Sequence, residues 1–191
     1  MSESSSTSAS SLQGDTLKKL HLGCGSVTPA GWVNSDVRPG EGVDLVADLI
    51  KGLPVKDESF DAVVSIHAIC ELGVWDQVPV LKEIHRVLKP GGVLRLSLPD
   101  LDLNIREYQA KNRSHFQLYQ WDTLAGNFIT QVLWHSTVHC FYTKDFVEEL
   151  LKKAGFSQVN HVSFGQTSTR WPVLASLDNR QQESLFVEAV K

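Results

Sequence analysis

The sequence predicts an α/β fold: a doubly wound, mostly parallel sheet of seven strands, with a helical insertion after the fifth strand. Short apolar runs alternate with loop or helix signals along a chain of 191 residues. The run 61–66 is β-branched and almost wholly apolar, as in a central strand that is covered on both faces. Polar residues follow several of these runs where each strand would end.

The elements follow from these runs in order. Strands are expected at 17–22, 32–37, 43–47, 61–66, 93–98, 156–164 and 184–190, the last two as a hairpin with a long connection. Residues 76–88 have apolar side chains at helical spacing, and Pro90-Gly91-Gly92 should stop that helix. Thr143 is typical of a helix N-cap, and Gly155 of the matching C-terminal stop.

Two segments fall outside this alternation. Residues 1–15 are serine-rich and are expected to form a disordered tail, which leaves 16–191 as a single domain. Residues 101–142 are rich in aromatic side chains and are expected to form a mostly helical insertion. This insertion is either a structural cap or a lid over a substrate pocket, which would need aromatic and apolar contacts with a few polar groups.

Composition excludes several classes of function. The net charge of −4 gives no overall basic surface for nucleic acid or an anionic membrane. No run approaches the roughly 20 apolar residues that cross a bilayer, and the N-terminus has no signal-peptide pattern. The three scattered cysteines predict neither a metal site nor a disulfide framework, and they suit the cytoplasm. A small-molecule substrate is therefore the favoured partner, whereas a local basic patch, a protein or tRNA acceptor and a homodimer are left open.

A glycine loop, His21-Leu22-Gly23-Cys24-Gly25, follows the first apolar run. Glycine lets the backbone approach a ligand closely and adopt positive φ. Asp36 and Asp48 end the next two predicted strands. Because ligands bind outside the carboxyl ends of the strands in such sheets, these acids, residues 65–67 and residues 99–100 should gather beside the loop.

Two cofactor classes compete for this loop. A dinucleotide needs a third glycine and a helix N-terminus for its pyrophosphate, but residues 26–31 are too short for a crossover helix. Asp36 also follows the motif after only about half of the usual ~20 residues. S-adenosylmethionine (SAM) has no phosphate, and Asp36 could accept hydrogen bonds from both ribose hydroxyls and Asp48 from the adenine amino group. SAM is therefore the favoured cofactor, although strand-end acids also serve simply as turn residues.

At this point the chain resembles the class I SAM-dependent methyltransferases, which have a Rossmann-like seven-stranded sheet. The similarity is greatest to a small subgroup with GCG and GW-x-N-x-D motifs, known mainly as predicted methyltransferases and in many cases linked to sugar or polysaccharide tailoring. The motifs that carry it are residues 21–25, 31–36, 46–49 with 53–54, 59–63, 83–92 and 98–100.

The resemblance implies SAM as cofactor and a set of residues that bind it. They are Gly23, Cys24 and Gly25 at the methionine end, Asp36 at the ribose, Asp48 and Leu49 at the adenine, and Ser65, Ile66 and His67 under the sulfonium. One segment departs from the pattern, because Cys70 and Glu71 take the places of a Glu-His pair that related proteins often carry. No role of that histidine can be carried over.

Methyl transfer is an in-line displacement on an electrophilic sulfonium, so such an enzyme mainly orients its reactants. A hydroxyl or amine acceptor also needs a base. His139 is the first candidate, since it precedes the helix start at Thr143 and should face the cleft. Asp100 is the second, with an N-cap of the insertion helix as its alternative role. His67 and His135 are further candidates, but His67 is expected rather to contact SAM.

The leading prediction is SAM-dependent O- or N-methylation of a small molecule, with a saccharide or natural product as candidate acceptors. The Cys70-Glu71 departure motivates an alternative: a regulatory or partner subunit that binds SAM or S-adenosylhomocysteine without methylating anything. A third candidate is an enzyme of this fold that does not transfer methyl, such as a cyclase or an aminopropyl transferase.

Overall fold

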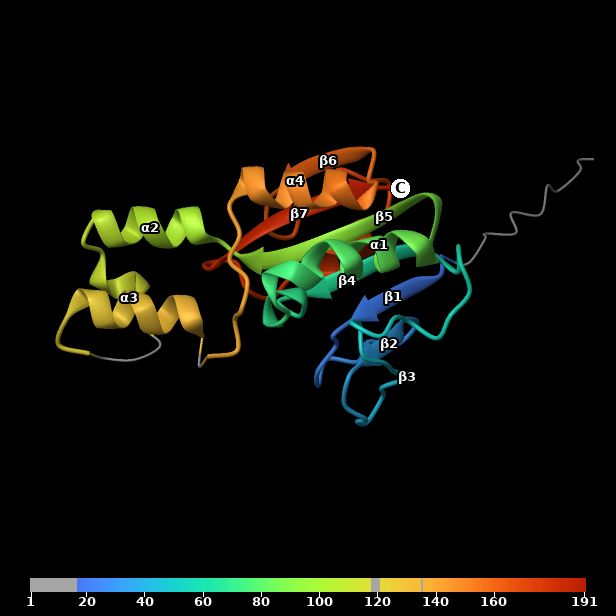
Figure 1. Ribbon diagram of the computed structural model, residues 1–191, viewed down its shortest axis with the longest axis horizontal. Coiled ribbons are helices and arrows are strands. Elements are labelled where there is room, and N and C mark those ends of the chain that lie inside the picture. Colours follow the sequence, from blue (N-terminus) through green and yellow to red (C-terminus); the bar gives the residue numbers. More distant parts are fainter. Residues whose placement is uncertain (1–16, 118–120, 135) are drawn as a thin grey trace, which may run out of the picture.

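A seven-stranded sheet forms the centre of the molecule in the computed structural model, which describes residues 17–117, 121–134 and 136–191 (Figure 1). Its strand order is β3-β2-β1-β4-β5-β7-β6. Strand β7 runs antiparallel to both of its neighbours, and the other neighbouring pairs are parallel. This confirms the predicted mostly parallel α/β sheet. The tail predicted at 1–15 lies outside the described residues.

Each predicted strand is present. The strands are β1 (Lys19–Leu22), β2 (Val33–Asp36), β3 (Leu45–Val46), β4 (Phe60–Ile66), β5 (Leu88–Pro99), β6 (Gln158–Val162) and β7 (Ser184–Val190). Strand β3 is shorter than expected. Strand β5 is longer, because it begins immediately after the preceding helix and contains Pro90-Gly91-Gly92. The preceding helix ends at Val87, just before these residues, as expected. The residues themselves lie at an irregularity in β5, where pairing with β4 jumps from Phe60–Leu88 to Ala62–Val93.

In the described ranges, four α-helices accompany the sheet: α1 (Gln77–Val87), α2 (Leu101–Gln109), α3 (Leu124–Leu133) and α4 (Lys144–Ala154). Four 3-10 helices are also described: η1 (Ile69–Glu71), η2 (Val74–Asp76), η3 (Arg113–His115) and η4 (Pro172–Leu177). The predicted start and end of α4 are confirmed: the Thr143 hydroxyl accepts a hydrogen bond from the Phe146 N–H, and Gly155 ends the helix with φ of 104°. Among the described residues, no helix is long and apolar enough to cross a membrane.

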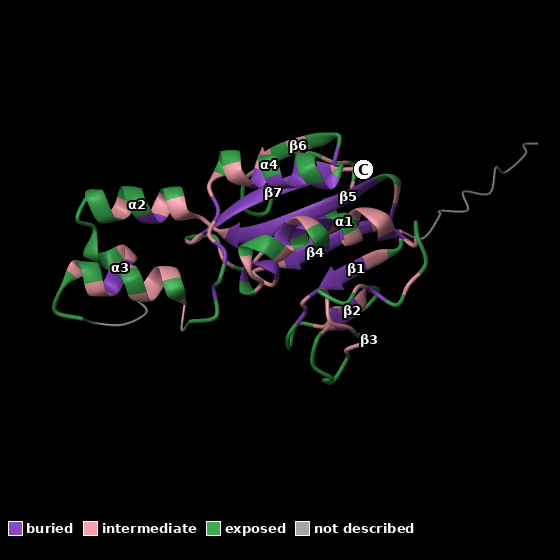
Figure 2. Cartoon of the chain, in the orientation of Figure 1, coloured by how far each residue is buried: buried purple, intermediate pink, exposed green. Residues whose placement is uncertain are grey.

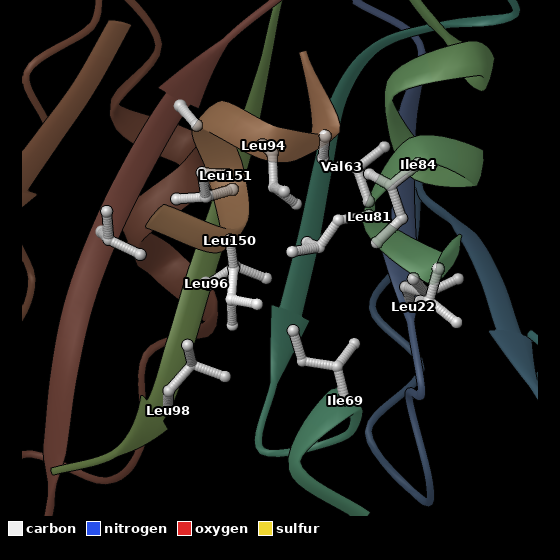
Figure 3. Packing of buried hydrophobic residues seen from close by; sticks show 14 of the residues in the cluster. Leu22, Val63, Ile69, Leu81, Ile84, Leu94, Leu96, Leu98, Leu150 and Leu151 are labelled. Carbon is white, nitrogen blue, oxygen red and sulfur yellow. The ribbon is translucent and has the colours of Figure 1, made fainter. Parts of the chain in front are cut away.

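The main core lies between the sheet and the helices α1 and α4, which pack side by side on one face (Figures 1 and 2). Alternate residues of β5 point toward these helices because side chains alternate across a strand. Figure 3 shows the resulting layer, which includes Leu94, Leu96 and Leu98 from β5, Leu81 and Ile84 from α1, and Leu150 and Leu151 from α4.

The opposite face of the sheet has a different cover. Leu174 and Leu177 of η4 pack there on Ala62 and Val64 of β4. The connection between β6 and β7 is thus folded over this face, where a doubly wound sheet leads one to expect α-helices. It is anchored by Arg95 of β5, a fully buried arginine that forms an ion pair with Asp178 in this connection.

The predicted helical insertion consists of α2, η3 and α3, which extend from the carboxyl end of β5 (Figure 1). The rings of Tyr108 and Phe128 join α2 to α3, with their centroids 4.8 Å apart. Phe116 closes the cluster, with its ring 5.8 Å from that of Phe128. The outer turns of both helices are exposed (Figure 2).

Candidate functional site

A cleft of about 1100 Å³ opens at the carboxyl ends of β1, β2 and β4. The glycine loop, Asp36, Asp48 and His67 all line it, which brings together the strand ends on which the sequence prediction depended. Its lining consists of residues 21–28, 35–41, 43, 47–49, 66–68 and 71–72, together with Thr137, Asn179 and Arg180.

The glycine loop turns back tightly over the end of β2. The Gly23 and Cys24 N–H groups both donate to the carbonyl of Ser35, at 2.8 and 3.0 Å. Gly23 has φ of 67°, and a Cβ added to it would lie 2.1 Å from the Cβ of Ala68. Glycine is therefore required at 23 both for its backbone angle and for the close approach of the loop to the end of β4.

Asp36, at the end of β2, bonds the glycine loop. One carboxylate oxygen accepts the Gly25 N–H at 2.9 Å, and the other accepts the Arg38 N–H at 3.0 Å. A carboxylate can accept about four hydrogen bonds, so Asp36 keeps acceptor capacity toward the cleft. Cys24, beside it, is buried, and burial raises the pKa of its thiol. Cys24 is therefore a neutral small side chain in the wall of the cleft.

Asp48 and Leu49 form the other end of the cleft lining. The Asp48 carboxylate bonds the Lys51 ammonium at 3.1 Å and accepts the Ile50 N–H at 3.1 Å. The hydrogen bond from Lys51, followed by that from Ile50, lowers the pKa of Asp48. This carboxylate is thus ionised at neutral pH and available as an acceptor.

His67 follows β4 in a strained backbone conformation, with φ of 50°. The backbone N–H of His67 donates to the Ser97 carbonyl at 2.9 Å, and the ring Nε2 lies 2.7 Å from the Ser184 hydroxyl. Burial, with a smaller contribution from the Arg180 charge, lowers the pKa of His67 to about 3. The imidazole is therefore neutral at neutral pH. Ser65, two residues earlier, is buried in the sheet and does not line the cleft.

A second, smaller pocket shares His67 with the cleft. Its other lining residues come from the end of β5, from α2 and α3, and from the segments before α4 and β7: Pro99, Leu101, Asn104, Gln131, Val132, Trp134, Val138, Phe141 and Glu183. The helical insertion thus contributes part of the wall. The free volume is about 20 Å³, close to the space of one water molecule, so the pocket is nearly filled by its own side chains.

The two residues that the sequence ranked as bases lie outside both linings. His139 is exposed, because Val138, Cys140 and Tyr142 alternate with it and point into the core. Asp100 has the alternative role considered for it: it is the N-cap of α2 and accepts the Leu103 N–H at 2.9 Å. His135 lies outside the described residues.

Sequence reasoning missed the contribution of the β6–β7 connection. Asn179 and Arg180 line the cleft, Glu183 lines the second pocket, and Ser184 bonds His67. They lie more than 100 positions beyond His67, in a polar stretch without a recognisable motif. Within the part of the chain that the structure describes, no group of three or more His, Cys, Asp or Glu side chains is placed to hold a metal ion.

Known proteins share the fold of this chain. Residues 33–96 match the methyltransferase domain family. A solved SAM-dependent methyltransferase from Thermotoga maritima superposes with a TM-score of 0.56 over 92% of this chain and 82% of that one, at 20% identity. The fold is that of a class I SAM-dependent methyltransferase.

Two further proteins are similar to this chain, one in sequence and one in structure. A probable SAM-dependent methyltransferase of Mycolicibacterium smegmatis is 41% identical over 58 residues, which span 30% of this chain and 22% of that relative's length. Phosphoethanolamine N-methyltransferase 2 of Haemonchus contortus, solved with SAM, gives a TM-score of 0.55 at 17% identity, over 92% of this chain and 48% of that one.

Proposed function

We propose that the chain transfers the methyl group of SAM to the oxygen or nitrogen of a small-molecule acceptor. The observation that carries the proposal is the junction at His67. A cleft built from the glycine loop and acidic strand ends meets there a second pocket walled partly by the helical insertion. Cofactor and acceptor could thus approach each other from opposite sides of one residue. A saccharide or natural product remains the proposed acceptor range.

The cleft residues fit SAM. A Cβ added to Gly25 would meet nothing within 4 Å, so the loop leaves open space beside the Asp36 carboxylate. Asp36 would accept hydrogen bonds from the ribose hydroxyls, and Asp48 with Leu49 would contact adenine. Gly23 and Cys24 would lie along the methionine end. SAM supplies the electrophilic methyl group, and these residues hold it in place.

The neutral imidazole of His67 would orient the acceptor. Its Nε2 is engaged by the Ser184 hydroxyl at 2.7 Å, which fixes the ring at the junction. With a pKa of about 3, His67 takes up a proton poorly at neutral pH. We therefore assign His67 and Ser184 to positioning the acceptor group. His139 and Asp100 would need a movement of the chain to reach the methyl group.

Calorimetric titration with SAM tests the cofactor half of this proposal. Wild-type protein should bind SAM, and Asp36→Asn should weaken binding at least about tenfold, because hydrogen bonds to charged groups contribute about 1.5–3 kcal/mol. Asp57→Asn is the matched control. Asp57 is exposed and pairs with Arg86 on the surface, so this variant should bind SAM with the affinity of the wild-type protein.

Two outcomes would contradict the proposal in different ways. No heat and no thermal shift at millimolar SAM would remove SAM as the cofactor. SAM binding without S-adenosylhomocysteine or methylated product, in mass spectrometry across hydroxyl and amine acceptors, would favour the non-catalytic SAM-binding alternative.

A further inference from the structure

Three side chains meet between the end of α3 and the start of β7. The Arg180 Nη1 lies 2.9 Å from the Glu183 Oε1. The guanidinium carbon of Arg180 also lies 5.2 Å from the centroid of the Trp134 ring. A carboxylate and an aromatic face thus hold a cation between them, and both interactions favour a positively charged group.

These three residues lie at the boundary of the two hollows. Trp134 and Glu183 line the second pocket, whereas Arg180 lines the cofactor cleft. The second pocket has a free volume of only about 20 Å³, so an acceptor must displace a side chain to enter it. Arg180 contacts Trp134 and Glu183 from the side of the cleft and is 33% exposed. Its withdrawal into the cleft of about 1100 Å³ would therefore open these two residues to an acceptor that enters from the cleft.

The charges around the boundary favour a cationic ligand. Among the described residues that line the second pocket, Glu183 is the only Asp, Glu, Lys or Arg, and His67 there is neutral. Arg180 already has a carboxylate partner, so it offers less to an anionic acceptor than an unpaired arginine would.

We propose that Trp134 and Glu183 form a subsite for a cationic ammonium or guanidinium group on the acceptor, which Arg180 fills in this structure. This inference rests on the proposed function and deepens it by naming the acceptor class. The cationic group anchors the acceptor beside His67, and the methylated oxygen or nitrogen is a separate part of the same molecule.

Emptying the subsite tests this inference without SAM. Arg180→Ala should bind methylguanidinium chloride about tenfold more tightly than wild type, because the competing internal cation is gone. The gain should disappear in Arg180→Ala combined with Glu183→Gln, and it should shrink with Trp134→Leu. Arg180→Gln, which keeps most of the side-chain length, serves as a second variant if the alanine variant does not fold. Calorimetry measures each affinity.

Lys153→Ala is the matched control. Lys153 pairs with Glu149 at 2.7 Å on the exposed side of α4, so its removal leaves a surface carboxylate without this lysine partner. This variant should gain no affinity for methylguanidinium. The inference is overturned if Arg180→Ala gains none either, if the gain survives Glu183→Gln, or if sodium acetate binds Arg180→Ala more tightly than methylguanidinium does. The failure of these titrations leaves the SAM titration unaffected, so the two proposals fail separately.

Discussion

At the scale of single residues, Gly23 lies where two segments of the cleft wall contact each other. The loop after β1 approaches Ala68 so closely that a methyl group on residue 23 would lie 2.1 Å from the Ala68 side chain. Ala68 follows β4 and His67, so this contact fixes the glycine loop against the segment that carries the junction. The geometry of the cleft therefore depends on the absence of one side chain.

Gly23→Ala should consequently lower the free energy of unfolding by about 2–4 kcal/mol and abolish measurable SAM binding. Forced contact in a packed region costs about 1–3 kcal/mol, and a non-glycine residue at positive φ adds about 1 kcal/mol. Urea unfolding measures the first effect and calorimetry the second. Gly25→Ala is the control for strain alone: its φ of 53° is similar, but an added Cβ meets nothing within 4 Å. Equal stability losses for the two variants would contradict the packing argument.

His67 should make the fold sensitive to acid. Its pKa is about 3 in the folded state, against 6.5 for an unperturbed histidine. The unfolded chain therefore binds the extra proton first, and stability is lost as pH falls below about 6.5. Between pH 7 and pH 5 this single group should cost about 2 kcal/mol. Urea unfolding at both pH values should show the loss.

His67→Gln should reduce that dependence on pH. The pH dependence of His85→Gln provides the comparison. His85 lies on α1, away from both hollows, and burial lowers its pKa as well. If His67→Gln leaves the slope of stability against pH unchanged, the low pKa of His67 is refuted.

At the scale of elements, the connection between β6 and β7 is held by buried charge. Arg95 of β5 bonds the Asp178 carboxylate through two nitrogens, at 2.9 and 2.5 Å, and also pairs with Glu188 of β7 at 2.7 Å. All three side chains are at most 1% exposed. The ion pairs therefore fix the connection to the second face of the sheet.

Asp178→Asn should destabilise the protein by about 3–5 kcal/mol, the usual cost of breaking a buried ion pair at one partner. Glu149→Gln, in the exposed pair with Lys153, should change stability by less than about 1 kcal/mol. Urea unfolding compares the two variants. A loss of less than about 1 kcal/mol for Asp178→Asn would show that the connection does not need this anchor.

The helices and strands also differ in how far the sequence could predict them. The strands and the helices α1 and α4 followed from local periodicity and from caps such as Thr143 and Gly155, because these signals lie within a few residues of the structure they determine. Pro90-Gly91-Gly92 was expected to follow the end of the helix, and α1 does end at Val87, but only the pairing of β5 with β4 shows that these residues belong to the strand.

At the scale of the whole molecule, the residues of the candidate site also divide into those that local patterns predicted and those that depend on distant contacts. Gly23, Asp36 and Asp48 were found because the carboxyl ends of parallel strands meet at one edge, a rule that needs no distant contact. Arg180, Glu183 and Ser184 were not, because the chain returns to that edge only after β6. His139 was expected to face the cleft from its position alone. The direction of its side chain depends on the burial of Val138 and Cys140 on either side of it.

One consequence follows from the way the β6–β7 connection divides its tasks. Its middle is clamped to the sheet at Asp178, while residues 179–184 reach the junction between the two hollows. Under the proposed function, exchange of the short stretch after the clamp should change which acceptor is bound, with the clamp and the glycine loop left as they are. Residues 179–184 are therefore the six consecutive positions to vary first in a library of variants with altered acceptor preference.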